Sequence, residues 1–130
     1  MAGYRTPLGR VRGLGSAKHG VGHFIGQRVS AVALVVLMLW GVYSALGLAQ
    51  ADHATAAQWL RSPWRAVPLA LLLGVALYHG QLGMRVVIED YIHKPATKTL
   101  LLMLNLFVCW LGAAIGIFSI LKVAFGGGAY

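Results

Sequence analysis

Apolar residues dominate three long stretches of the chain, and polar residues gather between them. The stretches run from about Val29 to Leu48, from about Ala66 to Ile88 and from about Leu100 to Val123. A helix needs about 20 predominantly apolar residues to cross the hydrocarbon core of a bilayer, and each stretch is long enough. The pattern therefore predicts an all-α membrane protein with three transmembrane helices, which together span residues 29–123.

The flanking segments are polar or rich in glycine. We expect residues 1–28 to form an N-terminal arm, extended over residues 1–15 and continuing as an interfacial helix over residues 16–28. Glycines at three positions of that second part make a helix there less stable, because each costs up to about 1 kcal/mol relative to alanine. Residues 124–130 form a short C-terminal tail.

Prolines mark the connections between the apolar stretches. We expect a short surface helix around Thr55–Leu60, ended by Pro63, with Pro68 in the first turn of the second span. The second connection is short and ends in Lys94-Pro95. A connection of that length places the second and third helices side by side and antiparallel.

Composition agrees with a membrane location. Of the 130 residues 58% are hydrophobic and only 11% are charged, too few charges to cover the surface of a soluble domain of this size. The three spans use most of the chain and leave no room for a soluble catalytic domain. Cys109, the single cysteine, lies in the third stretch, so an internal disulfide is impossible and we expect the thiol to pack as a small apolar group.

The chain has a net charge of +8, and most of its basic residues lie beside the predicted spans. This distribution argues against nucleic-acid binding. Eight of the basic residues lie in the N-terminal arm or near the second connection, and three lie on the opposite side. The eight are Arg5, Arg10, Arg12, Lys18, Arg28, Arg85, Lys94 and Lys98, and the three are Arg61, Arg65 and Lys122. The positive-inside rule then predicts a cytoplasmic N-terminus and, after three crossings, a periplasmic C-terminus.

His79 lies inside the second apolar stretch, where no water is present to hydrate an imidazole. It can donate a hydrogen bond to a backbone carbonyl or to a serine of a neighbouring helix. It can also be an axial ligand of haem iron, a common use of histidine. Gly83, one turn further on, would let a flat macrocycle lie close to the helix. A second ligand would then come from a partner subunit, because this chain offers one convincing intramembrane histidine.

Asp90 and Tyr91 follow at the end of the same stretch. Eleven residues advance a helix by about 1100°, so Asp90 shares a face with His79 at a distance of roughly 16 Å along the axis. The pair can simply anchor the helix end, or it can hydrogen-bond a quinone carbonyl and deliver a proton. Glu89 faces water or pairs with Arg85 four residues earlier.

Arg28 stands at the mouth of the first span. It is either a snorkelling positive-inside charge or a clamp for a carboxylate such as a haem propionate, which suits the fork of a guanidinium. His23, five residues before Arg28, is expected at the interface, and His19, His53 and His93 look peripheral. Gly112 and Gly116, four residues apart in the third stretch, would let two membrane helices approach closely.

These residues carry a resemblance to a known family. The elements are Leu14–Lys18, His23, the run Gln27–Ala31 and the block His79–Tyr91. With three spans in order, they resemble the hydrophobic membrane anchor D subunit of succinate dehydrogenase, and of its branches the alphaproteobacterial and mitochondrial type. The His-x10-Asp-Tyr spacing is the most specific element, and the likeness covers nearly the whole chain.

The resemblance implies a role in respiratory complex II. Such an anchor pairs with a cytochrome b membrane subunit in a heterodimeric haem-binding bundle. Together they hold the iron–sulfur and flavoprotein subunits at the bacterial inner membrane, and they bind one haem b and ubiquinone. By resemblance, His79 matches the ligand of the haem iron, Tyr91 and Asp90 match the quinone-site pair, and Arg28 matches an arginine near the haem propionates and the quinone.

On this reading the chain is no enzyme on its own. It serves electron transport from succinate to quinone, in the tricarboxylic acid cycle and the respiratory chain. Fumarate reductase, which runs the reaction in reverse, is an alternative of the same class. A small proton-coupled transporter and a structural anchor without haem are alternatives of other classes.

Overall fold

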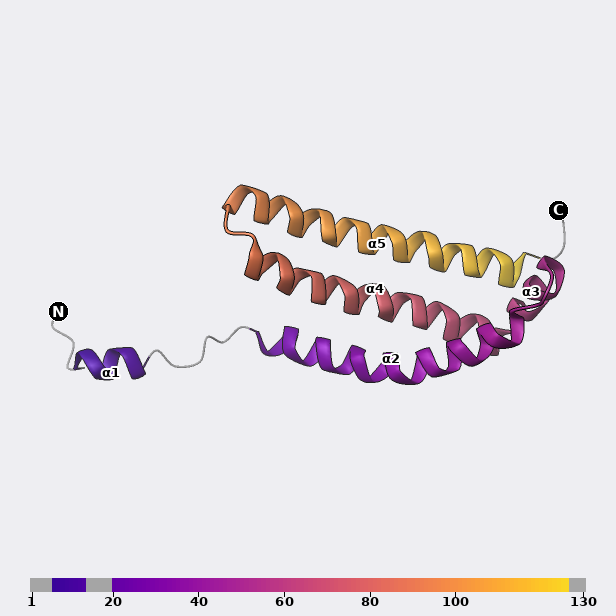
Figure 1. Cartoon of the computed structure of the whole chain (residues 1–130), viewed down its shortest axis with the longest axis horizontal. Coiled ribbons are helices and arrows are strands. Elements are labelled where there is room, and N and C mark those ends of the chain that lie inside the picture. Colours follow the sequence, from indigo (N-terminus) through magenta and orange to yellow (C-terminus); the bar gives the residue numbers. More distant parts are fainter. Residues whose placement is uncertain (1–5, 14–19, 127–130) are drawn as a thin grey trace.

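The chain folds into helices throughout the part that the computed structural model describes, residues 6–13 and 20–126. Two short helices and three long ones follow one another along the chain (Figure 1). They are α1 Pro7–Arg12, α2 Val21–Leu48, α3 His53–Leu60, α4 Pro63–Tyr91 and α5 Pro95–Phe125.

The long helices α2, α4 and α5 are all apolar and long enough to cross a membrane. They have 28, 29 and 31 residues, so each is roughly 42–46 Å long. The hydrocarbon core is about 30 Å thick, so their ends reach into the headgroup region and beyond. The predicted all-α membrane fold with three spanning helices is thereby confirmed.

The helices extend further than the apolar stretches. The first span continues backwards without a break to Val21, where Gly20 adopts a left-handed φ of 102° and ends the helical path. Within the arm, residues 7–12 form the helix α1, so the extended conformation expected for them was wrong. Thr6 explains this, because its hydroxyl caps α1 by accepting from the backbone N–H of Gly9 at 3.0 Å. Residues 14–19 and 127–130, which include His19 and the last residues of the tail, lie outside the described part.

The connection between α2 and α4 contains the surface helix expected around Thr55–Leu60. Asp52 caps its start, and the backbone N–H of Thr55 donates to the Asp52 carboxylate at 3.0 Å. Hydrogen bonds from the Thr55 side chain and backbone hold the pKa of Asp52 below its ordinary value. Pro68 lies inside α4 and not in its first turn, because Pro63 already occupies the helix start.

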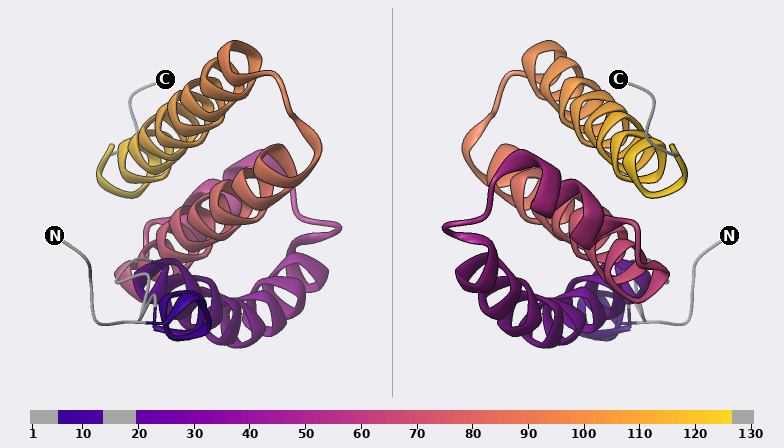
Figure 2. Two further views of the ribbon diagram at one scale, coloured as in Figure 1. Left: turned by 90° about the vertical axis from the view of Figure 1, so that its left-hand side faces the viewer. Right: turned by 90° about the vertical axis from the view of Figure 1, so that its right-hand side faces the viewer.

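The central helix is α4, which packs along both α2 and α5. Seen end-on, the three long helices are arranged with α4 between its two neighbours (Figure 2). The short connection from Tyr91 to Pro95 makes α4 and α5 antiparallel neighbours, as predicted. The start of α2, the end of α4 and the start of α5 therefore share one end of the bundle, and α3 lies at the other (Figure 1).

Small residues let the long helices approach one another. A Cβ added to Gly116 would overlap the side chain of Leu73 on α4, whereas one added to Gly112 would meet Leu77 at an ordinary 3.6 Å. On the other side of α4, a Cβ added to Gly41 of α2 would come within 2.8 Å of Leu72. The predicted close approach of the third span is confirmed, and it depends more on Gly116 than on Gly112.

Very little of the chain is enclosed by its own helices. Among the described residues only Ala66, Leu82, Ile88 and Ser30 are buried, while large apolar side chains along all three spans are exposed. Of the buried residues only Ser30 is polar. The outward apolar side chains need lipid or another apolar protein surface around them, and three helices in one layer supply neither.

We predict that Gly116→Ala destabilises the packing of α4 on α5 by about 1–3 kcal/mol, because the new methyl group displaces Leu73 from a tightly packed site. Gly112→Ala is the matched control, since it gains the same helix propensity without that overlap. Thermal unfolding of the purified assembly measures both variants. Equal midpoints for the two would contradict the close contact.

Candidate functional site

His79 bridges α4 and α2 through both nitrogens of its ring. Nδ1 lies 2.9 Å from the hydroxyl oxygen of Ser30, and Nε2 lies 3.5 Å from the amide nitrogen of Gln27. Ser30 is only 6% exposed, so the first of these contacts is well shielded. The structure thus realises one of the two roles considered for His79, a hydrogen bond to a serine of a neighbouring helix.

The two contacts of the Ser30 hydroxyl are the basis for assigning which ring nitrogen of His79 carries the proton. Its oxygen also lies 3.2 Å from the backbone carbonyl of Gln27, which can only accept a hydrogen bond. The hydroxyl has one proton, so that proton goes to the carbonyl. With the serine proton on that carbonyl, Nδ1 of His79 donates to the Ser30 oxygen, and in this tautomer Nε2 carries the lone pair.

Two further polar atoms on the same face of α2 have no hydrogen-bond partner within the described part of the chain. They are the side-chain oxygen of Gln27 and Nε2 of His23, and both are buried. His23, Gln27 and Ser30 are spaced by four and three residues, so they form one polar file toward α4. Nε2 of His23 is therefore buried on the face of α2 that also carries the contacts to His79, whereas its sequence position alone suggested an interfacial histidine.

Gly83 lies beside this file. A Cβ built on it would come no closer than 3.8 Å to any described atom outside its own neighbourhood, the nearest being the amide nitrogen of Gln27. That distance is ordinary van der Waals contact. Packing within this chain therefore does not demand glycine at position 83.

Arg28 lies at the depth of His79 along α2, since Gln27 and Ser30 on either side of it contact that ring. Its side chain is exposed, and the guanidinium carbon lies 4.7 Å above the centre of the Phe24 ring. Within the described part of the chain it forms no hydrogen bond or ion pair with His79, Asp90 or Tyr91. The structure thus leaves Arg28 on the outside of this chain, where a neighbouring subunit or a headgroup can reach it.

Asp90 and Tyr91 occupy the last turn of α4 and are both exposed. Tyr91 follows His79 by twelve residues, which corresponds to roughly 18 Å along the helix. The pair is therefore well separated in depth from His79 and Arg28. Arg85 and Glu89 form the predicted ion pair nearby, with 2.8 Å between Nε and the carboxylate oxygen.

A hollow of about 320 Å³ opens beside Tyr91 at the α4–α5 connection. Its other lining residues are Ile92, His93, Lys94 and Thr97. His93 is oriented by its Nδ1–H, which donates to the backbone carbonyl of Tyr91 at 3.2 Å. Sequence reasoning missed His93 and Thr97 as neighbours of Tyr91, since only the turn between the helices brings them together.

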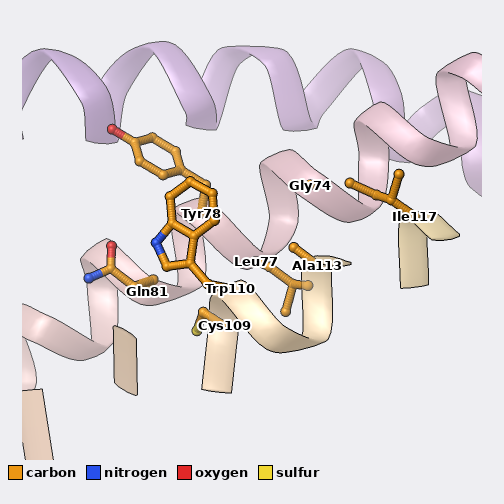
Figure 3. A pocket seen from close by; sticks show the side chains of 8 residues that line it. All are labelled: Gly74, Leu77, Tyr78, Gln81, Cys109, Trp110, Ala113 and Ile117. Atoms are coloured by element: carbon orange, nitrogen blue, oxygen red, sulfur yellow. The ribbon is translucent and has the colours of Figure 1, made fainter. Parts of the chain in front are cut away.

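A second cavity, of about 150 Å³, lies between α4 and α5 (Figure 3). It is lined mainly by apolar side chains, with Gln81 and Cys109 as the polar exceptions. The Tyr78 ring borders it and directs its hydroxyl toward α2 (Figure 3), where a Cβ on Gly26 would lie 2.7 Å from that oxygen. Close by, the Asn105 amide of α5 donates to the backbone carbonyl of Gln81 at 3.0 Å.

The described residues offer isolated ligands and no metal cluster of their own. No three histidine, cysteine or acidic side chains gather among residues 6–13 and 20–126 in a way that would hold an ion. A metal bound near His79 would therefore need its remaining ligands from a prosthetic group or from another chain.

Comparison with known proteins gives a consistent result. Residues 2–115 match the family described as succinate dehydrogenase/fumarate reductase transmembrane subunit. A succinate dehydrogenase hydrophobic membrane anchor subunit of Rickettsia bellii is 36% identical over 105 residues, which cover 80% of this chain and 84% of that protein.

Two other relatives carry the same name. The protein of Rickettsia conorii is 36% identical over 80% of this chain and 84% of its own length. That of Paracoccus denitrificans is 30% identical over 126 residues, 95% of both chains. With a family match over residues 2–115 and a relative that aligns over 95% of both chains, this chain belongs to the succinate dehydrogenase/fumarate reductase transmembrane subunit family.

Proposed function

We propose that this chain is the membrane anchor subunit of a succinate:quinone oxidoreductase and that it helps to bind haem b and ubiquinone. Its family and the names of its relatives support the anchor role. The observation that carries the haem proposal is His79, an imidazole between two apolar spans with one nitrogen held by Ser30 and a lone pair on the other.

The residues around His79 fit a haem. A neutral imidazole whose second nitrogen donates a hydrogen bond is the usual form of a metal-bound histidine. The amide of Gln27 makes only a 3.5 Å contact with Nε2, and its buried oxygen has no partner among the described residues, so little holds the amide there. Haem b would supply a one-electron redox centre, and His79 would hold its iron from this side while a partner subunit supplies the second ligand.

Around such a haem, Gly83 and Arg28 have separate tasks. Gly83 presents no side chain one turn from His79, and nothing in this chain's packing requires glycine there. Arg28 is at the depth of His79 with an exposed guanidinium, which suits a haem propionate held between this chain and its partner. Arg28 would also reach a quinone headgroup bound at that depth, but not one bound in the hollow beside Tyr91, roughly 18 Å away along the helix axis.

The quinone proposal concerns the hollow at the end of α4. The Tyr91 hydroxyl would donate a hydrogen bond to a carbonyl oxygen of ubiquinone, and Asp90 beside it would orient the phenol or supply a proton. Both residues are exposed at the helix end, so protons can reach them from water. Electrons would arrive from the iron–sulfur subunit on the same side, after succinate oxidation in the flavoprotein subunit.

Acid placement argues against a proton-coupled transporter. The chain has three acidic residues, and none lies in the middle of a span. Asp52 stands in the connection before α3, and Glu89 and Asp90 occupy the last turn of α4. A transporter that couples to protons needs an ionisable group deep in the membrane path. Fumarate reductase remains the alternative within the family, since the anchor geometry is the same for either direction of the reaction.

We predict that His79→Leu abolishes or weakens the b-type absorption of the assembled complex, or shifts its midpoint potential, because an axial ligand sets the electronic state of the iron. Visible spectra and a redox titration measure this. His53→Leu is the control, since His53 is an exposed residue at the start of α3. A spectrum and a midpoint potential unchanged by His79→Leu would refute the haem assignment.

Tyr91→Phe should slow ubiquinone reduction by up to about 10²-fold at limiting quinone, because it removes one hydrogen bond to the developing negative charge and keeps the ring. Haem content should stay the same, and so should succinate oxidation by a soluble acceptor that bypasses the membrane. Tyr43→Phe, at an exposed tyrosine on α2, should leave every one of these rates unaltered. Wild-type quinone turnover in Tyr91→Phe would remove this hydroxyl from the mechanism.

Charge distribution generates a prediction about topology. Eight of the eleven basic residues lie in the N-terminal arm or near the second connection. We therefore expect the end of the bundle where α2 starts and α4 ends to face the cytoplasm of a bacterium. A reporter fused after Tyr130 should be active only in the periplasm. Activity in the cytoplasm alone would contradict this orientation.

A further inference from the structure

Ser30 has a position in the structure that none of the assigned roles uses. It is the only buried polar residue in the described part of the chain, and its hydroxyl makes two contacts within 3.2 Å. One joins it to the carbonyl of Gln27 in its own helix, and the other joins it to Nδ1 of His79 on α4. If Ser30 only satisfied its own buried hydroxyl, the hydrogen bond to the Gln27 carbonyl would be enough.

The chain contains a serine of that simpler kind. Ser119 of α5 donates to the backbone carbonyl of Ile115 at 2.8 Å, is exposed and touches no other side chain through a hydrogen bond given by the structure. The comparison isolates what is different at Ser30, namely the imidazole that donates to its oxygen.

We propose that Ser30 is a positioning residue for His79: its hydroxyl holds the ring in the Nδ1–H form and so keeps the Nε2 lone pair available for iron. This inference rests on the proposed haem function. The carbonyl of Gln27 takes the serine proton, which leaves the serine oxygen free only to accept. In the Nε2–H form of the ring the hydroxyl would have to turn and donate to Nδ1, and its hydrogen bond to the Gln27 carbonyl would be lost.

The contact would also tune a haem iron held by His79. An acceptor on Nδ1–H makes an imidazole a stronger electron donor, and a stronger donor ligand favours ferric over ferrous iron. Removing the acceptor would therefore raise the midpoint potential of the haem. It also frees the ring to rotate, so that less haem is retained when haem is scarce.

The orphaned oxygen of Gln27 fits the same arrangement. In this chain the amide lies against Nε2 with its oxygen buried and without a partner among the described residues, an unfavourable state for a polar group. Ligation of Nε2 would displace the amide and let it find partners elsewhere. Ser30 is therefore the permanent contact of the ring, and Gln27 is the replaceable one.

The test uses the assembled complex carrying Ser30→Ala, Ser30→Thr or Ser119→Ala. Haem content, midpoint potential and the ferric low-spin electron paramagnetic resonance signal are measured for each. Ser30→Ala should raise the potential and shift the resonance, and haem content should fall at limiting haem supply. Ser30→Thr keeps the hydroxyl and should restore wild-type values, while Ser119→Ala should leave all three readouts unchanged.

Ser30→Cys covers the case in which alanine prevents assembly, because a thiol fills the space and is a weaker acceptor, so the potential should shift in the same direction but less. Wild-type potential and resonance in Ser30→Ala or Ser30→Cys, in complex that contains haem, would overturn the role of Ser30 and leave the haem proposal standing. A wild-type complex without any b-type haem would overturn the proposed function and this inference with it.

Discussion

An imidazole between two membrane helices must find its hydrogen-bond partners inside the protein, and this requirement organises the chain. Lipid tails offer no hydrogen-bond donor or acceptor to the imidazole. Ser30 and Gln27 of α2 therefore face α4 and contact the two ring nitrogens of His79. These contacts fix how the two helices lie along one another, because a shift by one residue would turn Ser30 away from the ring. The surrounding apolar side chains are compatible with many registers between α2 and α4, and the polar contacts select one of them.

The opposite face of α4 is joined to α5 in a different way. There the close approach depends on Gly116 beneath Leu73. Two interhelical hydrogen bonds add to it, from the Asn105 amide to the carbonyl of Gln81 and from the Lys98 ammonium to the carbonyl of Glu89. Contact area between apolar surfaces gives little net attraction in lipid, so small residues and a few polar bonds must hold the pair. Polar contacts of His79 therefore position α2 on α4, whereas the small residue Gly116 lets α5 pack closely on the other side.

The sequence was sufficient for some features and not for others. Three spans, their order and the antiparallel pair could be predicted, because hydropathy reports directly what lipid tolerates. The helix ends could not, since backbone hydrogen bonding continues past the apolar segment until a residue such as Gly20 or Pro63 changes the backbone path. Capping by Thr6 likewise made a helix where glycine, proline and arginine suggested an extended arm.

The candidate site also has features that the sequence predicted and features that it did not. That His79 needs a partner, and that a serine on a neighbouring helix can be one, follows from its apolar surroundings. The identity of that serine, and the inward position of His23, depend on the register between α2 and α4, which no local pattern contains. His93 and Thr97 join Tyr91 only through the turn that links α4 to α5. The glycine at position 83 remains unexplained by contacts within the chain.

One rigid helix carries both proposed redox positions at different depths. His79 and Tyr91 are roughly 18 Å apart along α4, one between apolar spans and the other at the helix end. Proton supply explains the need for that separation. A quinone must take up protons as it is reduced, so its headgroup belongs beside water, whereas a redox centre that changes only its electron count does better where water is excluded. Because α4 is continuous from Pro63 to Tyr91, His79 and Tyr91 keep a fixed distance along the helix axis. The hydrogen bonds to α2 and the glycine contacts with α5 hold α4 in place between its neighbours.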